Sequence, residues 1–276
     1  MFELPEYINL AKQINAALNG KTIQCGNLGN SPHKFVWYNR SQEEFTDLTQ
    51  GKKIGKSHAK GRWLFIPFEP GYTLLFGECG GKILFHQADS KLPKKYHLYL
   101  TFTDLSFLTA TTQMWGAMEL YEQGEEFKRE YVKDMRPTPI DPEFTFTYFN
   151  ALMDESIGQK KRSTKSLLTQ EQLIPGLGNA IAQDILFNAG LHPRHPIDDL
   201  DHAQRGKLYA GIMDTIEEIT EQGGRYDEFD LFGQKGGYVR IMDKNALERP
   251  CPQCEGEIKK IQYLGGACYF CPNCQQ

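Results

Sequence analysis

The stretch Thr169–Pro196, TQEQLIPGLGNAIAQDILFNAGLHPRHP, decides how the second half of this chain folds. Its polar start ends in the turn sequence Pro175-Gly176-Leu177-Gly178-Asn179, and apolar residues then recur at helical spacing until Gly190 and Pro193. A glycine turn that leads into a helix N-terminus directs free backbone N–H groups toward an incoming anion. Asn179 stands at the expected cap position, where its amide can donate to the same anion. The alternative is an ordinary pair of packed helices without a ligand.

Two Cys-x-x-Cys pairs near the C-terminus predict a metal site. Cys251 and Cys254 form the first pair, Cys271 and Cys274 form the second, and sixteen residues separate the pairs. This spacing is typical of a structural zinc ion held by four thiolates on a two-knuckle ribbon. Disulfides are the weaker interpretation, because the total of seven cysteines is odd and no secretory signal precedes them. We do not expect Cys268, which lies between the pairs, to bind the metal ion.

Length and composition place the chain among globular proteins. Its 276 residues suit two domains and a small module, and 40% hydrophobic residues are enough for real cores. No apolar run reaches transmembrane length, so we expect a soluble protein without membrane contact. Free cysteines without a signal sequence predict a reducing, cytoplasmic location.

The net charge of −4 argues mildly against nucleic acid as a partner, but a mean charge can hide local patches. Basic residues cluster at Lys52-Lys53, Lys56–Arg62, Lys160–Lys165 and Lys259-Lys260. Lysine clusters are usually solvated faces. Because the third cluster directly precedes the glycine turn, we interpret it as a phosphate contact.

Periodicity divides the chain into a β-rich first part and a helical second part. Pro5–Gly20 is predicted to be a helix, and 21–120 reads as short strands of an antiparallel sandwich. Residues 125–136 are charged and are followed by Pro137, Pro139 and Pro142, so we place the linker between the domains there. Further helices are expected at 141–152, 166–173, 180–189 and 203–222, followed by an irregular stretch at 226–248 and the ribbon from Pro250.

Three stretches together resemble the formamidopyrimidine-DNA glycosylase/endonuclease VIII family of base-excision repair enzymes. They are the N-terminal Glu3-Leu4-Pro5-Glu6, the helix–two-turn–helix sequence GLGNAIAQDILFNAGLHP, and the terminal CPNCQ of a zinc finger. The resemblance implies an α+β multidomain fold, with an N-terminal helix and antiparallel β-sandwich at 1–125. A helix–two-turn–helix domain at 137–224 and a zinc ribbon at 247–276 would follow. The implied partner of this monomer is double-stranded DNA that contains damaged bases or abasic sites.

The first departure from the family lies at the nucleophile. In the family, a proline next to the initiator methionine forms a Schiff base, and a neighbouring glutamate moves protons. Here Glu3 and Glu6 are present, but position 2 is Phe2, which has no nucleophilic side chain. The free amine is then expected on Met1, one residue out of register. Glu6 has an equally good alternative as a charge that stabilises the helix dipole.

Further departures concern DNA contacts. The family's phosphate-contacting lysine aligns with Arg62, and Lys60, expected on the same face of that strand, could act as an amine nucleophile. The family's arginine–phenylalanine pair in the reading head aligns with Met114-Trp115, and Trp115 can still wedge or stack. The zinc-hairpin arginine aligns with Ala267. Lys165 and Asn179, which match the family's phosphate contacts, are retained in this sequence.

The sequence therefore predicts a DNA glycosylase that removes damaged bases. We expect hydrolysis assisted by Glu3, without a stable Schiff base, so that lyase activity stays open. One alternative is a catalytically silent reader of damaged DNA. The other is a zinc-ribbon scaffold that uses the helical turn to bind a protein.

Overall fold

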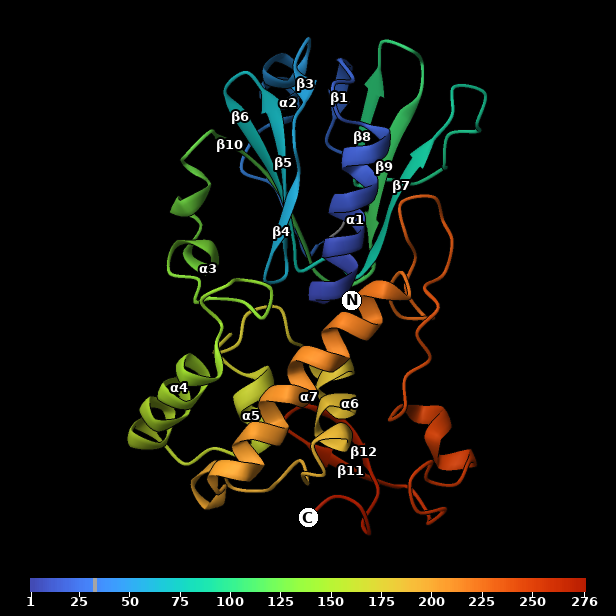
Figure 1. Ribbon diagram of the computed structural model, residues 1–276. Helices are drawn as coiled ribbons and strands as arrows, with labels where there is room; N and C mark the ends of the chain where they lie inside the picture. The colour runs from blue at the N-terminus through green and yellow to red at the C-terminus, as the bar shows by residue number, and fades with distance from the viewer. Residues whose placement is uncertain (32–33) are drawn as a thin grey trace. The chain divides into compact units, whose positions relative to one another are not determined.

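A computed structural model describes residues 1–31 and 34–276 (Figure 1). Contacts within the chain define two compact units, each built from two separate stretches. The first unit contains Met1–Met135 and Thr220–Tyr238, and the second contains Arg136–Ile219 and Val239–Gln276. The segment that follows the longest helix therefore packs with the N-terminal half of the chain.

Two sheets form most of the first unit. Their strands are β1 (Ile23–Asn27), β2 (Val36–Trp37), β3 (Lys53–Ile54), β4 (His58–Lys60), β5 (Trp63–Glu69), β6 (Tyr72–Gly77), β7 (Gly81–His86), β8 (Leu98–Phe102), β9 (Phe107–Thr112) and β10 (Gly116–Glu122). One sheet has the order β1-β8-β9-β7, and the other has the order β2-β10-β6-β5-β3 with β4 paired to β5. Among these strand pairs only β2 and β10 run parallel.

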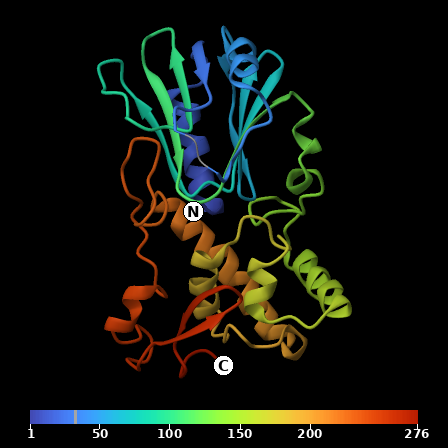
Figure 2. The same ribbon diagram turned by 180° about the vertical axis from the view of Figure 1, so that it is seen from behind.

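Helix α1 (Leu4–Ala17) lies between the two sheets of this unit (Figures 1 and 2). Pro5 in the first turn presets a helical backbone. Tyr7, Leu10 and Ile14 recur on one side and are buried in the core that both sheets share. The N-terminus of the chain is thereby fixed at the start of a well-packed helix.

The first unit also contains short helices that the sequence analysis missed. Helix α2 (Gln42–Thr49) interrupts the region predicted to be all β. It begins in a capping box, in which the Glu44 N–H donates to Ser41 Oγ and the Ser41 N–H donates to the Glu44 carboxylate. The predicted linker holds a 3₁₀ turn, η1 (Glu126–Lys128), and helix α3 (Glu130–Lys133).

The second unit is helical with one hairpin. It contains α4 (Phe146–Gln159), α5 (Thr164–Thr169), α6 (Asn179–Asn188), the 3₁₀ turn η2 (Ile197–Asp199), all but the last two residues of α7 (His202–Glu221), the 3₁₀ turn η3 (Lys244–Glu248), and the antiparallel strands β11 (Lys259–Tyr263) and β12 (Gly266–Phe270). Gln183 of α6 accepts a hydrogen bond of 2.7 Å from the Tyr269 N–H, so the helix and the hairpin are joined.

The α+β fold class is confirmed, with an N-terminal helix, antiparallel sheets and a helical domain. The first predicted helix of the second unit was misplaced: it begins after the N-cap Thr145, whose hydroxyl accepts a hydrogen bond from the Tyr148 N–H. The spacing of apolar residues predicted a helix at 141–152 and does not by itself show that the N-cap lies at Thr145. None of the helices in the described ranges is long and apolar enough to cross a membrane.

Candidate active site

Phe2 anchors the N-terminus in the core of the first unit. Its side chain is fully buried, and its ring meets Tyr7 edge-to-face with centroids 5.7 Å apart. Its backbone N–H donates a 2.9 Å hydrogen bond to the carbonyl oxygen of Cys79. Position 2 therefore acts as a hydrophobic anchor, and Met1 is the residue that carries the chain's free amine.

The Met1 amine is paired with a carboxylate from a distant part of the chain. Its nitrogen lies 2.7 Å from Glu228 Oε1, and Glu228 is largely buried. Glu228 belongs to the segment that follows α7, which packs with the first unit. An ammonium group and a carboxylate at this distance form a charge-assisted hydrogen bond.

Arg225 links the N-terminal residues into one cluster. Its Nε and Nη2 atoms donate to the two oxygens of Glu6 at 2.9 and 2.8 Å, and Nη2 also donates to the Met1 carbonyl oxygen at 2.8 Å. Its Nη1 lies 3.7 Å from Glu3 Oε1, and its Nη2 lies 3.7 Å from Glu228 Oε1. A planar guanidinium can hold several acceptors at once in this way.

The charges of this cluster do not cancel. Three carboxylates, from Glu3, Glu6 and Glu228, surround two cations, the Arg225 guanidinium and the Met1 amine. Burial alone would lower the pKa of Arg225, but the charges of Glu6 and then Glu3 more than reverse this and raise it. Burial raises the pKa of Glu228, while the Met1 amine opposes that rise. The formal sum with all groups ionised is one negative charge.

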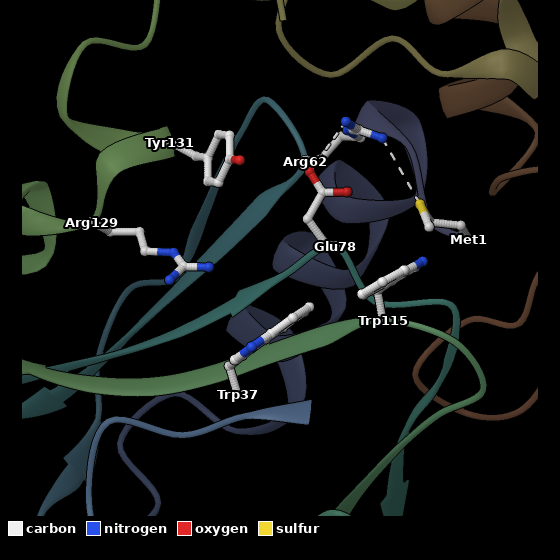
Figure 3. Close-up of a pocket in the computed structure, with 7 residues that line it drawn as sticks. All are labelled: Met1, Trp37, Arg62, Glu78, Trp115, Arg129 and Tyr131. Atoms are coloured by element: carbon white, nitrogen blue, oxygen red, sulfur yellow. Dashed lines mark hydrogen bonds and ion pairs between the residues drawn. The ribbon is translucent and has the colours of Figure 1, made fainter. Parts of the chain in front are cut away.

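A pocket of about 580 Å³ opens beside Met1 in the same unit (Figure 3). Its lining residues are Met1, Trp37, Arg62, Glu78, Trp115, Arg129 and Tyr131. Arg62 Nη2 lies 3.2 Å from Glu78 Oε1, and Arg62 Nη1 lies 3.8 Å from the Met1 sulfur. The pocket therefore combines aromatic rings with an ion pair.

The structure separates Lys60 from Arg62. Lys60 ends β4, whereas Arg62 lies in the turn that joins β4 to β5, with Gly61 at a φ of 57°. The expectation that both lie on one face of a single strand was wrong, because this glycine turn reverses the chain between them. Arg62 lines the pocket and Lys60 does not.

Trp115 lies with its ring parallel to that of Trp37. The two rings are 5.5 Å apart between centroids with an interplanar angle of 6°. Met114, the neighbouring residue, is exposed. Trp115 therefore forms part of the pocket wall.

In the second unit, Asn179 is exposed and is the first residue of α6, while Gly178 is the N-cap. The expectation that Asn179 is the cap was one residue off, because the extended backbone of Gly178 fills that role. Lys165 is buried, and its Nζ donates a 2.7 Å hydrogen bond to the Tyr263 carbonyl oxygen of the hairpin. Lys165 thereby joins α5 to the hairpin.

The four cysteines of the two pairs form a cluster that could hold a metal ion. The Sγ atoms of Cys251, Cys254, Cys271 and Cys274 all lie within 4.8 Å of one another. The Cys251–Cys274 and Cys254–Cys271 sulfur pairs are 3.8 and 3.5 Å apart. Tetrahedral zinc with Zn–S bonds of about 2.3 Å requires sulfur separations of roughly 3.8 Å, so this donor set fits the ion.

Sequence reasoning missed Arg225, Glu228, Glu78 and Trp37. The signal for the first two was the charged sequence RYDE directly after Gly223-Gly224, in a region otherwise interpreted as an irregular loop. Nothing local shows that this loop returns to the N-terminus. Trp37 and Glu78 are isolated in sequence, and only the pairing of β2 with β10 and the turn after β6 place them at one pocket.

Comparison with known proteins supports the fold and its family. Residues 1–117 match the formamidopyrimidine-DNA glycosylase N-terminal domain, and residues 135–229 match the formamidopyrimidine-DNA glycosylase H2TH domain. The formamidopyrimidine-DNA glycosylase of Bacillus licheniformis is 28% identical over the whole of both chains. That of Lactobacillus delbrueckii subsp. bulgaricus is 29% identical, again over the whole of both chains.

Solved structures share the fold at lower identity. The Lactococcus lactis Fpg in complex with DNA containing an abasic site is 23% identical with a TM-score of 0.86, over 99% of each chain. The same protein in complex with DNA containing N7-benzyl-Fapy-dG is 24% identical, also with a TM-score of 0.86 and 99% coverage of each chain. With two domain matches that together span most of its length, the chain belongs to the formamidopyrimidine-DNA glycosylase family.

Proposed function

We propose that this protein is a DNA N-glycosylase that releases damaged bases from double-stranded DNA by hydrolysis, without forming an imine. The glycosylase activity is supported by full-length similarity to formamidopyrimidine-DNA glycosylases and by both of their domains. The hydrolytic route is inferred from this chain's own residues and not from its relatives. It is supported by one observation, the 2.7 Å contact between the Met1 amine and Glu228.

The Met1–Glu228 pair disfavours attack by the amine. Imine formation requires an unprotonated nitrogen with a free lone pair near the sugar. The Met1 nitrogen donates a 2.7 Å hydrogen bond to Glu228 Oε1, which directs the amine toward that carboxylate. Phe2, fixed in the core, keeps the amine at this position. Met1 and Phe2 thus contribute as structural parts of the site, with no covalent step.

Glu3 and Glu6 take different roles in this proposal. Both oxygens of Glu6 accept hydrogen bonds from Arg225, so Glu6 is a positioning residue. Glu3 lies farther from Arg225, at 3.7 Å, and is the carboxylate that orients and deprotonates water. The water oxygen bonds to C1′ of the sugar, and the bond from C1′ to the base breaks. The base leaves with the bonding electrons and is then protonated.

The excess negative charge of the cluster suits this reaction. Departure of the base leaves positive charge on the sugar, and fixed carboxylates stabilise charge that develops in the transition state. The cluster of three carboxylates and two cations supplies one such negative charge. Lys60 takes no part in this route, because hydrolysis needs no amine.

The DNA contacts follow from exposure and charge. Asn179, at the N-terminus of α6, is exposed and can donate to a backbone phosphate. Arg62 adds a cation at the pocket and Trp115 an aromatic surface. Within the second unit, Lys165 joins α5 to the hairpin, since one of its three N–H groups donates to the Tyr263 carbonyl oxygen.

The cysteine cluster holds one structural zinc ion per chain in this proposal. The ion would be bound by Cys251, Cys254, Cys271 and Cys274, whose spacing and donor atoms suit tetrahedral zinc. It would fix the hairpin that Lys165 and Gln183 contact. Thiolates that stay reduced for metal binding favour a reducing, cytoplasmic location.

Base release from a panel of duplexes with oxidised bases tests the proposal. We expect release by the native protein, and a loss of about 10²–10⁴-fold in rate for Glu3→Gln. Glu43→Gln, an exposed carboxylate on α2, is the matched control and should be unchanged. Tight duplex binding without release of any base would instead support a silent reader of damage, and no duplex binding would support a scaffold.

A further inference from the structure

A separate pocket lies wholly within the second unit. Its volume of about 380 Å³ is within the usual range of small-molecule sites, roughly 300–1,000 Å³. Residues 161–163, which precede α5, form one part of its wall, and residues of the stretch 194–199, between α6 and α7, form another. Tyr263 of the hairpin completes the lining.

Hydrogen bonds fix these three parts of the wall to one another. The Ile197 N–H donates to the Arg162 carbonyl oxygen at 3.0 Å, which joins the first two parts. The Lys165 ammonium donates to the Tyr263 carbonyl oxygen at 2.7 Å and so holds the hairpin against the start of α5. Because the wall is already ordered, a ligand would bind without a large cost in conformational entropy.

Arg162 is the unusual residue of this pocket. Its side chain is only 1% exposed, and its Nη2 donates a 2.6 Å hydrogen bond to Glu171 Oε2. Its Nε and Nη1 are buried as well, and neither has a hydrogen-bond partner in the part of the chain that the structure describes. Buried polar groups in proteins are nearly always hydrogen-bonded. Two donors of a buried guanidinium therefore lack the acceptor that such a group requires.

The charge of Arg162 is also incompletely balanced. Its partner Glu171 forms a second ion pair, with the Lys160 ammonium, so one carboxylate serves two cations. Lys161 and Arg194 are exposed and bring two more cations to the same pocket. An anion is the ligand that this excess of positive charge favours.

Two carboxylates give the pocket a second property. Asp198 and Asp199, both exposed on η2, line it together with the three cations, so the formal sum over these five side chains is one positive charge. Carboxylates repel an anion but accept hydrogen bonds from hydroxyl groups. The lining therefore suits a ligand that carries both an anionic group and hydroxyls.

Tyr263 holds one of the cations at the pocket. The central carbon of the Arg194 guanidinium lies 5.0 Å from the centroid of the Tyr263 ring, and Arg194 Nη2 donates to the Gln262 carbonyl oxygen at 3.5 Å. This cation–π contact restrains a side chain that is otherwise exposed.

We propose that this pocket binds a small phosphomonoester that carries free hydroxyl groups, such as a sugar phosphate or a ribonucleotide. The planar Arg162 guanidinium donates to two phosphate oxygens, and Lys161 and Arg194 balance the charge of the dianion. Asp198 and Asp199 accept hydrogen bonds from the hydroxyls. The proposal does not depend on the proposed glycosylase function.

A phosphodiester within a DNA strand fits this pocket less well. It carries a single charge, whereas a phosphomonoester carries nearly two. Its strand also continues on both sides of the phosphate, while the Arg162 side chain is almost fully buried. The pocket thus differs in chemistry from the exposed phosphate contact proposed at Asn179.

Isothermal titration calorimetry of the full chain with defined compounds tests the pocket. Ribose 5-phosphate should bind about 10- to 150-fold more tightly than ribose, the gain expected from a hydrogen bond to a charged group. Inorganic phosphate, which has no sugar hydroxyls, should bind more weakly than ribose 5-phosphate. Adenosine 5′-monophosphate bound more tightly than ribose 5-phosphate would identify a nucleotide as the ligand, and equal or weaker binding would identify a sugar phosphate. Equal binding of ribose and ribose 5-phosphate, or no binding of either, would overturn the proposal.

Four variants connect binding to the named residues. Arg162→Lys keeps the charge beside Glu171 but loses the planar pair of donors, and Arg194→Gln removes an exposed cation that the fold does not need. Each should weaken ribose 5-phosphate binding by about 10- to 150-fold. Asp198→Ala should reduce the preference for ribose 5-phosphate over inorganic phosphate. Lys207→Ala, an exposed cation on α7, is the control and should change nothing. Native affinity in both Arg162→Lys and Arg194→Gln would contradict the assignment of this site.

Discussion

The Met1 amine lies 2.7 Å from a carboxylate of Glu228, a residue from the far end of the chain. Glu228 is itself 3.7 Å from Arg225, which also contacts Glu6. Two residues of the loop that follows α7, Arg225 and Glu228, thus contact the N-terminal residues Met1 and Glu6. In this chain the terminal amine is the ion-pair partner of Glu228, a residue of the loop after α7.

Arg225→Ala should strongly destabilise the first unit. The guanidinium is almost fully buried and is the shared partner of Glu6 and the Met1 carbonyl. Removing it leaves buried carboxylates without a counter-ion, so we expect a loss of about 3–5 kcal/mol in the free energy of unfolding. Urea denaturation measures this. Arg225→Lys, which keeps the charge but not the paired geometry, should lose less, and equal losses would contradict the role of charge.

Phe2→Ala should also destabilise the protein. The side chain is fully buried against Tyr7, so its removal leaves a cavity and costs about 3–5 kcal/mol. Phe2→Leu, which fills more of the space, should cost less in the same thermal or urea denaturation. Wild-type stability in Phe2→Ala would show that position 2 does not anchor the N-terminus. Phe2→Pro is consequently a poor test of catalysis by itself, because it disturbs packing.

Purified protein should contain one zinc ion per chain. Cys251→Ser should reduce the zinc content, because it removes one of four sulfur ligands that lie within 4.8 Å of one another. Cys25→Ser, an exposed cysteine on β1, is the control and should retain full zinc. Metal analysis by mass spectrometry provides the measurement. Full zinc content in Cys251→Ser would exclude this cluster as the site.

Asn179→Ala should weaken binding to damaged and undamaged duplexes alike, because a phosphate contact carries no sequence information. A lost charge-assisted hydrogen bond costs about 1–3 kcal/mol. Fluorescence anisotropy over a salt series measures this, and affinity should fall steeply as salt rises. Gln159→Ala, exposed on α4 of the same unit, should bind as the native protein does. Native affinity of Asn179→Ala at every salt concentration would remove this residue from the DNA interface.

Local patterns predicted the secondary structure and the metal cluster well. Helix α1 follows from an apolar repeat and a proline at its start, and the four cysteines follow from spacing alone. The errors have local causes too. Helix α2 is short and polar, so its capping residues Ser41 and Glu44 were a better signal than its weak periodicity.

The active-site cluster could be predicted only in part. Glu3 and Glu6 stand beside the terminus in sequence, but Arg225 and Glu228 reach it through tertiary packing across more than two hundred residues. The spacing of apolar residues along the chain carries no information about such a long-range contact with the N-terminus. The same holds for the pocket, in which Trp37, Glu78 and Trp115 come from different strands and turns.

Borohydride trapping on duplexes whose damaged base is released tests the hydrolytic mechanism most directly. Because the Met1 amine is engaged in an ion pair with Glu228 at 2.7 Å, the native protein should release the base and leave no covalent adduct. Glu228→Gln removes that ion pair and should allow an adduct to form through Met1. A strong adduct with the native protein, located at Met1 or Lys60 by peptide mapping, would contradict hydrolysis.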